Sequence, residues 1–372
     1  MRITGIKVFQ VDLPIAGGEF HQSGGRIWRS LDSTVVRIST DAGIVGWGES
    51  CPFGANYIPA FPQEVRGGIE VLAPDLIGQD PRNLQSLGRY MDTQLYGTPA
   101  AKTAIDNACW DILGKVTGLP VFTLLGGRTM EDTPTTMGFF EINLGPPSEE
   151  AIREAQSRGG DRFEFKASGD PRTDIEMARA IGRYMKPGDT LKIDVNGGWR
   201  IDEALRVAQA LNDIHVLYEQ PCSSYEECLA FKTATGRPVS LDECIHGVRD
   251  LLRAIEDRAI DVLNLKIGRV GGLSKSKLLR DLCVAVGIPM YIQDTSGGEF
   301  NAAATAHLAQ STPPGFIIAA WDCAIAVSKQ IGYGLERNSP QQMRAPDVPG
   351  MGVEPDLDVL GEPVAVYGDV RK

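Results

Sequence analysis

The most constraining feature of this sequence is the regular spacing of short apolar runs that each end near a polar or charged residue. After about residue 130, such runs alternate with amphipathic segments that open at Ser, Thr, Asp or Pro and close near Gly. Their ends fall 23 to 28 residues apart. The period predicts a (β/α)8 barrel, whose functional residues lie at the carboxyl ends of its strands. We expect strands at Thr136 to Phe140, Arg162 to Lys166, Leu191 to Asp194, Val216 to Glu219, Val239 to Asp242, Val262 to Lys266, Met290 to Asp294 and Phe316 to Asp322.

The N-terminal third has a different pattern, which is typical of an α+β domain. Met1 to Pro14 alternates like a strand, and Ser33 to Glu49 is a hairpin around Asp41-Ala42-Gly43. Helical spacing follows at Gln63 to Ile77, Asn83 to Leu95 and Ala100 to Thr117. We therefore expect an α+β domain at 1–130 and a barrel at 131–338. The Pro- and Gly-rich segment 339–372 is expected to be an irregular tail that returns to the first domain.

Composition narrows the possible partners. The net charge of −11 repels nucleic acid and anionic lipid. The longest uncharged stretch, Phe300 to Trp321, contains Asn, His, Gln, Pro and Gly, so we expect a buried helix, a turn and a strand there rather than a membrane span. The 7 cysteines are scattered and never spaced as CxxC, which indicates a reducing cytoplasm and neither zinc nor disulfides. Among the possible classes of partner, these observations favour a small-molecule substrate.

Three successive strands end in carboxylates, namely Asp194, Glu219 and Asp242. An unpaired charge is expensive inside a strand, so this order is not typical of surface charge. An all-oxygen ligand set suits a hard divalent cation, and Mg²⁺ fits best because it leaves positions open for water or a substrate carboxylate.

A lysine ends the strand on each side of the acids, at Lys166 and Lys266. Two amines on opposite sides of one chelated substrate can remove a proton from one face and deliver a proton to the other. This arrangement predicts proton abstraction from a carbon next to a carboxylate. We expect the cation and nearby positive groups to lower a lysine pKa toward neutrality, so that the amine can act as a base.

Weaker signals mark further candidates. A single polar residue at a strand end is typical of a solvated loop, and the Gly268 to Gly272 segment is typical of a simple turn. The loops Ile15 to Ile27 and Cys51 to Phe61 are expected to close over the substrate. We expect substrate binding or support of the site from Asn196, Glu243, Asp294, Trp321, Asp322, Tyr57 and His21.

At these residues the chain resembles the enolase superfamily, in its muconate lactonising branch, over nearly its whole length. The resemblance implies an N-terminal capping domain on a modified (β/α)8 TIM barrel, with Mg²⁺ held by the three carboxylates, the two lysines as acid and base, and a homo-oligomer. Members of this branch usually have a KxK motif on the second strand, in which the second lysine is the catalyst. In this chain Glu164 occupies the position of the first lysine. The matching motifs are Lys166 in FEFKASGD, Asp194 in KIDVNGGW, Glu219 in YEQP, Asp242 in SLDE and Lys266 in LNLKIGRVGG.

Within that branch, the chain is similar to the cis-3-hydroxy-L-proline dehydratases and to the proline and proline-betaine epimerases, partly through QDTSGGEFNAAATAHLA. The resemblance implies dehydration of cis-3-hydroxy-L-proline to Δ1-pyrroline-2-carboxylate. We expect Asp294 or Trp321 to receive the ring ammonium, by charge or by a cation–π contact. The first alternative is a racemase or 2-epimerase of proline, hydroxyproline or proline betaine. A Schiff-base lysine aldolase, whose adduct borohydride would trap, and a binding barrel without catalysis are further alternatives.

Overall fold

The computed structural model describes residues 1–372 except 136–138, 158–159, 340–341 and 370–372. Its N-terminal part is built on a four-stranded antiparallel sheet in the order β19-β1-β4-β5. The hairpin expected around Asp41 to Gly43 joins β4 to β5, and Gly43 has the positive φ of 75° that its turn needs. The strands are β1 (Ile3–Pro14), β4 (Ser30–Thr40), β5 (Val45–Ser50) and β19 (Ala365–Gly368).

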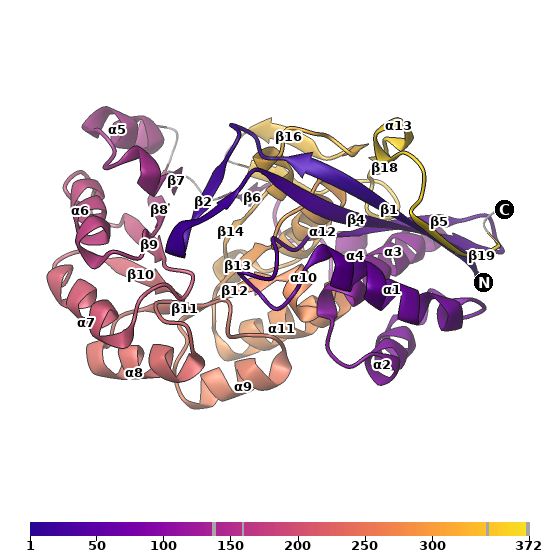
Figure 1. Ribbon diagram of the computed structural model, residues 1–372, viewed down its shortest axis with the longest axis horizontal. Helices are drawn as coiled ribbons and strands as arrows, with labels where there is room; N and C mark the ends of the chain where they lie inside the picture. Colours follow the sequence, from indigo (N-terminus) through magenta and orange to yellow (C-terminus); the bar gives the residue numbers. More distant parts are fainter. Residues whose placement is uncertain (136–138, 158–159, 340–341, 370–372) are drawn as a thin grey trace.

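Helices α1 and α3 pack against this sheet, α2 packs against these two helices, and α3 also faces the barrel (Figure 1). Helix α3 is buried along nearly its whole length. Gly48 of β5 allows the helix to approach the sheet closely, because glycine has no side chain. A Cβ atom at Gly48 would lie 2.1 Å from the Ala104 carbonyl oxygen. On its other side, Trp110 Nε1 donates to Ser274 Oγ at 2.9 Å. The helices are α1 (Pro62–Leu76), α2 (Leu84–Gln94) and α3 (Pro99–Thr117).

The second part is a curled parallel sheet of eight strands in the chain order β7 to β14, which confirms the predicted class of fold. Thr135 forms a parallel bridge with Ala320 of β14, while Phe139 pairs with β8, so one stretch of chain touches both ends of the sheet. Residues 136 to 138 of the expected first strand lie outside the described residues. The strands are β7 (Phe139–Phe140), β8 (Arg162–Lys166), β9 (Thr190–Asp194), β10 (Val216–Glu219), β11 (Val239–Leu241), β12 (Val262–Lys266), β13 (Met290–Gln293) and β14 (Ile317–Ala320).

Helices follow the strands from β7 to β13 and cover the outside of the sheet (Figure 1). The ends of these helices have the capping residues that the sequence analysis used to locate them. Ser224 Oγ accepts from Glu227 N at the start of α8, and Gly236 closes that helix at a φ of 63°. The helices are α5 (Glu149–Ser157), α6 (Pro171–Gly182), α7 (Ile201–Ala210), α8 (Tyr225–Thr235), α9 (Val248–Glu256), α10 (Ile267–Val270), α11 (Leu273–Val286) and α12 (Glu299–Gln310).

The C-terminal segment is more regular than the irregular tail we expected. Within it, β17 pairs with β6 beside the barrel, and β19 pairs with β1 of the N-terminal sheet. Backbone pairing therefore orders this Pro- and Gly-rich stretch. Its elements are β17 (Gln342–Arg344), β18 (Glu354–Pro355), α13 (Leu357–Leu360) and β19, and their partners include β16 (Glu336–Ser339), β6 (Thr133–Pro134) and β15 (Gly332–Tyr333).

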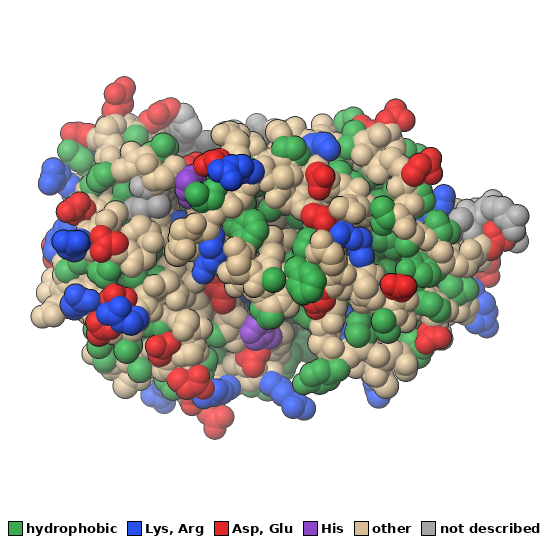
Figure 2. Space-filling model, in the orientation of Figure 1, with side chains coloured by type: hydrophobic (Ala, Val, Ile, Leu, Met, Phe, Trp, Pro, Cys, Tyr) green, Lys and Arg blue, Asp and Glu red, His purple; other side chains and the backbone are tan. Residues whose placement is uncertain are grey.

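The surface carries both signs of charge. Figure 2 shows acidic and basic side chains interspersed over one face, with apolar side chains between them. This distribution agrees with a net charge of −11 that is spread out rather than gathered on that face.

Candidate active site

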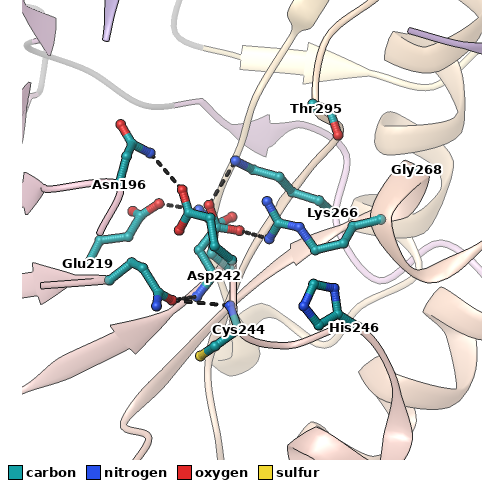
Figure 3. A network of polar contacts seen from close by, with 12 residues as sticks. Asn196, Glu219, Asp242, Cys244, His246, Lys266, Gly268 and Thr295 are labelled. Atoms are coloured by element: carbon teal, nitrogen blue, oxygen red, sulfur yellow. Dashed lines mark hydrogen bonds and ion pairs between the residues drawn. The ribbon is translucent and has the colours of Figure 1, made fainter. Parts of the chain in front are cut away.

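The three predicted carboxylates lie together at the carboxyl edge of the parallel sheet. Asp194 ends β9, Glu219 ends β10 opposite it in register, and Asp242 follows β11 directly. All three are almost fully buried, with at most 1% of each residue exposed. In Figure 3, Glu219 and Asp242 converge from neighbouring strands. Parallel strands in register produce this cluster because their last residues meet at one edge.

The two lysines end the strands that flank the three carboxylate strands in the sheet. Lys166 ends β8, lies opposite Asp194 in register, and forms an ion pair with its Oδ2. Lys266 ends β12, and its Nζ lies 2.8 Å from Asp242 Oδ2 (Figure 3). The structure thus brings all five residues of the predicted set into one network.

The electrostatics of this network differ from our expectation. Burial alone would lower the pKa of Lys166, but the charges of Asp194 and Glu219 outweigh burial and raise it. Burial likewise works against the positive charge of Lys266, and Asp242 raises its pKa above the ordinary value. The expected lowering is therefore not produced by the chain's own groups, because each amine sits directly on a carboxylate.

The cluster fits a hard divalent cation. Carboxylate oxygens of Glu164, Asp194 and Glu219 all lie within 4.8 Å of one another in buried positions. Burial and the neighbouring Asp194 raise the pKa of Glu219 to about 8, although the charge of Lys192 opposes them. An all-oxygen set of this kind suits Mg²⁺ better than zinc or copper. The third predicted ligand, Asp242, has both oxygens engaged, by Arg269 and by Lys266.

Lys192 is a member of this network that the sequence analysis missed. It lies opposite Glu164 in register, and its Nζ is 2.6 Å from Glu219 Oε2 and 3.1 Å from Glu164 Oε2. The amine also lies 4.1 Å from the centre of the Tyr291 ring. A cation beside Glu164 therefore comes from the neighbouring strand. Strand alternation gave the signal, because the side chain two residues before Asp194 must point to the same face.

Arg269 was also missed, because the glycines around it favoured a simple turn. Its guanidinium is only 4% exposed and forms an ion pair with Asp242 Oδ1. The charge of Asp242 raises the pKa of Arg269 despite the opposing effect of burial, so the group stays cationic. The only available signal was an arginine three residues after Lys266, which ends β12.

A pocket of about 300 Å³ opens onto the two lysines. Phe20 of β2 (Phe20–Gln22) and Phe53 line it, with ring centres 5.7 Å apart. Ser23, just after β2, donates its hydroxyl to the Ala167 carbonyl at 2.5 Å. The loops predicted to close over the site therefore contribute part of its wall.

Two of the remaining predicted residues line this pocket, whereas Tyr57, Asn196 and Glu243 are not among the described residues that line it. Trp321 and Asp322 line it, and Asp322 is also held by Arg337 at 2.6 Å. The Tyr57 hydroxyl accepts from Lys266 Nζ at 3.2 Å. Asn196 Nδ2, at the edge of Figure 3, donates to Glu243 Oε1 at 2.9 Å.

Two predicted residues lie elsewhere. His21 Nε2 faces Glu19 at 3.3 Å and is not among the described residues that line the pocket. Asp294 follows β13 but is not among the described residues that line the pocket: its Oδ1 accepts from Gly268 N and Thr295 N, and it lines a second cavity. Backbone hydrogen bonds fix this orientation, which the position at a strand end could not show.

Comparison with known proteins agrees with this geometry. Residues 148–359 match the enolase C-terminal domain-like family, and residues 28–126 match the mandelate racemase/muconate lactonizing enzyme N-terminal domain. A cis-3-hydroxy-L-proline dehydratase from Roseibium aggregatum is 45% identical over 99% of this chain and 100% of its own. An N-succinyl-L-Arg/Lys racemase from Bacillus cereus is 28% identical over the full length of both.

Solved structures show the same relationship. A mandelate racemase/muconate lactonizing enzyme from Roseovarius nubinhibens superposes with a TM-score of 0.93 at 36% identity, over 100% of both chains. An enolase superfamily member from the same organism, complexed with magnesium, has a TM-score of 0.88 at 38% identity over 99% of this chain and 100% of its own.

The chain is an enzyme of the enolase superfamily and belongs to its mandelate racemase/muconate lactonizing enzyme family. None of the helices in the described part of the chain has the length and hydropathy that crossing a bilayer requires.

Proposed function

We propose that this enzyme dehydrates cis-3-hydroxy-L-proline to Δ1-pyrroline-2-carboxylate with the help of Mg²⁺. The observation that carries the proposal is the pair of lysines that flank one buried carboxylate cluster. The 45% identity to a cis-3-hydroxy-L-proline dehydratase over the whole chain supports this substrate.

Asp194, Glu219 and Asp242 would hold the Mg²⁺, and Glu164 lies within reach of the first two. Bound there, the cation would stabilise the negative charge that develops on the substrate carboxylate when the α-proton leaves. Its charge would also offset the carboxylates that raise the lysine pKa values, which favours a neutral amine.

The lysines carry the two proton transfers. Lys166 removes the α-proton, and the electron pair of the broken C–H bond forms the carbon–carbon double bond as the C–O bond breaks. Lys266 protonates the departing hydroxyl, which leaves as water. In the cis isomer the hydroxyl lies on the face opposite the α-hydrogen, so the elimination needs groups on both faces. The resulting enamine then tautomerises to Δ1-pyrroline-2-carboxylate.

The pocket suits a small cyclic substrate. Its volume of about 300 Å³ lies at the lower end of ligand sites. Phe20 and Phe53 contribute apolar wall, and Trp321, which also lines the pocket, would contact a ring ammonium through its π-face. Asp294 lines a different cavity, so we assign the ammonium contact to Trp321 rather than to Asp294.

An NMR assay in D₂O tests the proposal and separates the two lysines. Purified enzyme with Mg²⁺ is expected to convert cis-3-hydroxy-L-proline. Lys166→Ala should lose both conversion and α-hydrogen exchange. Lys266→Ala should lose conversion by about 10²-fold to 10⁴-fold but keep some exchange, because the base remains. Lys277→Ala, which removes a surface amine paired with Asp281, is the matched control. If the wild-type enzyme neither dehydrates this substrate nor exchanges its α-hydrogen, the assignment is wrong.

The second candidate is a racemase or 2-epimerase acting on proline, hydroxyproline or proline betaine. The opposed lysines favour it too, since one amine could remove the α-proton and the other return a proton to the opposite face. The Bacillus cereus relative is itself a racemase. Deuterium incorporation with inversion and without loss of water would replace the dehydratase by this function.

A further inference from the structure

A second cavity, of about 760 Å³, lies between the N-terminal part and the barrel. Its wall comes from the segment after β5, the start of α3 and helices α9, α10 and α11. Thr295 lines both this cavity and the catalytic pocket, whereas the lysines of the catalytic pair line only the latter among the described residues. The volume is that of a site for a small organic molecule.

One end of this cavity carries a buried cation with unused donors. Arg269 lines it and is 5% exposed. Its Nη1 is taken by Asp242, but Nε and Nη2 are buried and have no hydrogen-bond partner among the described residues. These two N–H groups form one edge of the planar guanidinium, which matches the two oxygens of a carboxylate.

A buried acceptor lies in the same wall. Asp294 is 1% exposed, and its Oδ1 accepts from Gly268 N at 3.1 Å and from Thr295 N at 2.6 Å. Its Oδ2 has no partner among the described residues. In Figure 3, Gly268 and Thr295 lie on the Lys266 side of the network, away from Glu219. Asp294 Oδ2 is thus placed to accept from a hydroxyl group.

The charges around the cavity favour an anion. Lys102 and Lys275 both bind Oδ1 of Asp92, at 2.8 and 2.7 Å, so two cations share one carboxylate. Arg269 adds a further positive charge. The rest of the wall is largely apolar and includes Ile58, Pro59, Val248 and Leu279.

We propose that this cavity is a second ligand site for a small organic acid with an apolar body. The carboxylate of the ligand binds the Nε and Nη2 edge of Arg269, a hydroxyl group donates to Asp294 Oδ2, and the apolar part lies along Val248 and Leu279. This cavity is distinct from the catalytic pocket, although Thr295 lines both and Arg269 also pairs with Asp242, and binding there does not require the proposed dehydration.

Fluorine NMR with para-fluorophenyllactate as the probe tests this site on the full chain in EDTA. We expect saturable binding that is at least tenfold weaker for the corresponding amide, which has no negative charge. Lys166→Ala should bind the probe as the wild type does, because this variant alters only the catalytic pocket. Equal binding of acid and amide, loss of binding in Lys166→Ala, or no binding at millimolar probe would each overturn the proposal.

A variant that fills the cavity provides a second test of the proposed site. Val248→Trp places a large ring in the cavity and should weaken probe binding at least tenfold while dehydration of cis-3-hydroxy-L-proline is unchanged. Leu252→Trp, at an exposed position on the same helix, is the matched control and should bind normally. Lys275→Ala, which removes a partly exposed cation from the wall, should weaken binding severalfold and more at low salt. Undiminished binding in both Val248→Trp and Lys275→Ala would refute the location.

Discussion

Glu49 is a buried carboxyl group that joins the N-terminal sheet to helix α12 of the barrel. Its Oε1 accepts from Ser33 Oγ and Gly298 N, each at 2.7 Å, and its Oε2 accepts from Asn301 N at 3.1 Å. Burial raises its pKa from 4.5 to about 7, although these hydrogen bonds partly oppose the change. The protonation of Glu49 should therefore contribute to the pH dependence of stability.

The sign follows from proton binding. Between pH 4.5 and 7 the folded protein holds a proton that the unfolded chain has lost, so stability falls as pH rises through this range. The contribution is complete below the unfolded pKa and is lost above the folded pKa. At about 1.4 kcal/mol per pH unit, the pKa difference corresponds to about 3 kcal/mol.

Glu49→Gln removes this titration while keeping the size of the side chain. Urea unfolding of both proteins in EDTA at several pH values gives the difference in unfolding free energy, in which the other groups cancel. Relative to the variant, the wild type should lose about 2 to 3 kcal/mol between pH 5 and pH 8. Ser33→Ala removes a hydrogen bond that lowers the pKa and should steepen the loss. A difference that does not change with pH would refute the reasoning.

Other predictions concern packing, the counter-charge in the site and the cation. Gly67→Ala meets nothing within 4 Å in helix α1 and should stabilise the protein by about 0.5 to 1 kcal/mol in urea unfolding, whereas Gly68→Ala would place Cβ 2.7 Å from the Ala101 Cβ and should destabilise it. Lys192→Met leaves buried carboxylates unpaired and should cost about 3 to 5 kcal/mol in EDTA; adding Glu164→Gln should recover part of this loss, and an additive double mutant would contradict the pairing. Mg²⁺ at about 100 times the Kd of the wild type should raise the unfolding free energy of the wild type by about 3 kcal/mol. If a Glu219→Gln variant gains as much at the same Mg²⁺ concentration, Glu219 is not a ligand of the cation.

Local patterns in the sequence were sufficient to predict the barrel and the central charges. The spacing of strand ends defined the βα units, and strands in parallel register place Lys166, Asp194 and Glu219 at one edge without any further information. Helix caps and the Asp41 to Gly43 turn are likewise decided within a few residues of sequence. These features depend on short-range geometry, so residue type and spacing in the sequence are enough to predict them.

Only the tertiary structure decided how the buried charges pair. Lys192 lies 28 residues from Glu164, and Arg269 lies 27 residues from Asp242, yet each pair is in contact because adjacent strands and turns bring them together. The same long-range packing turned Asp294 onto Gly268 and into a second cavity. The position of a residue at a strand end determines where its Cα atom lies. Which partner stabilises its buried charged side chain depends on the packing of the whole fold.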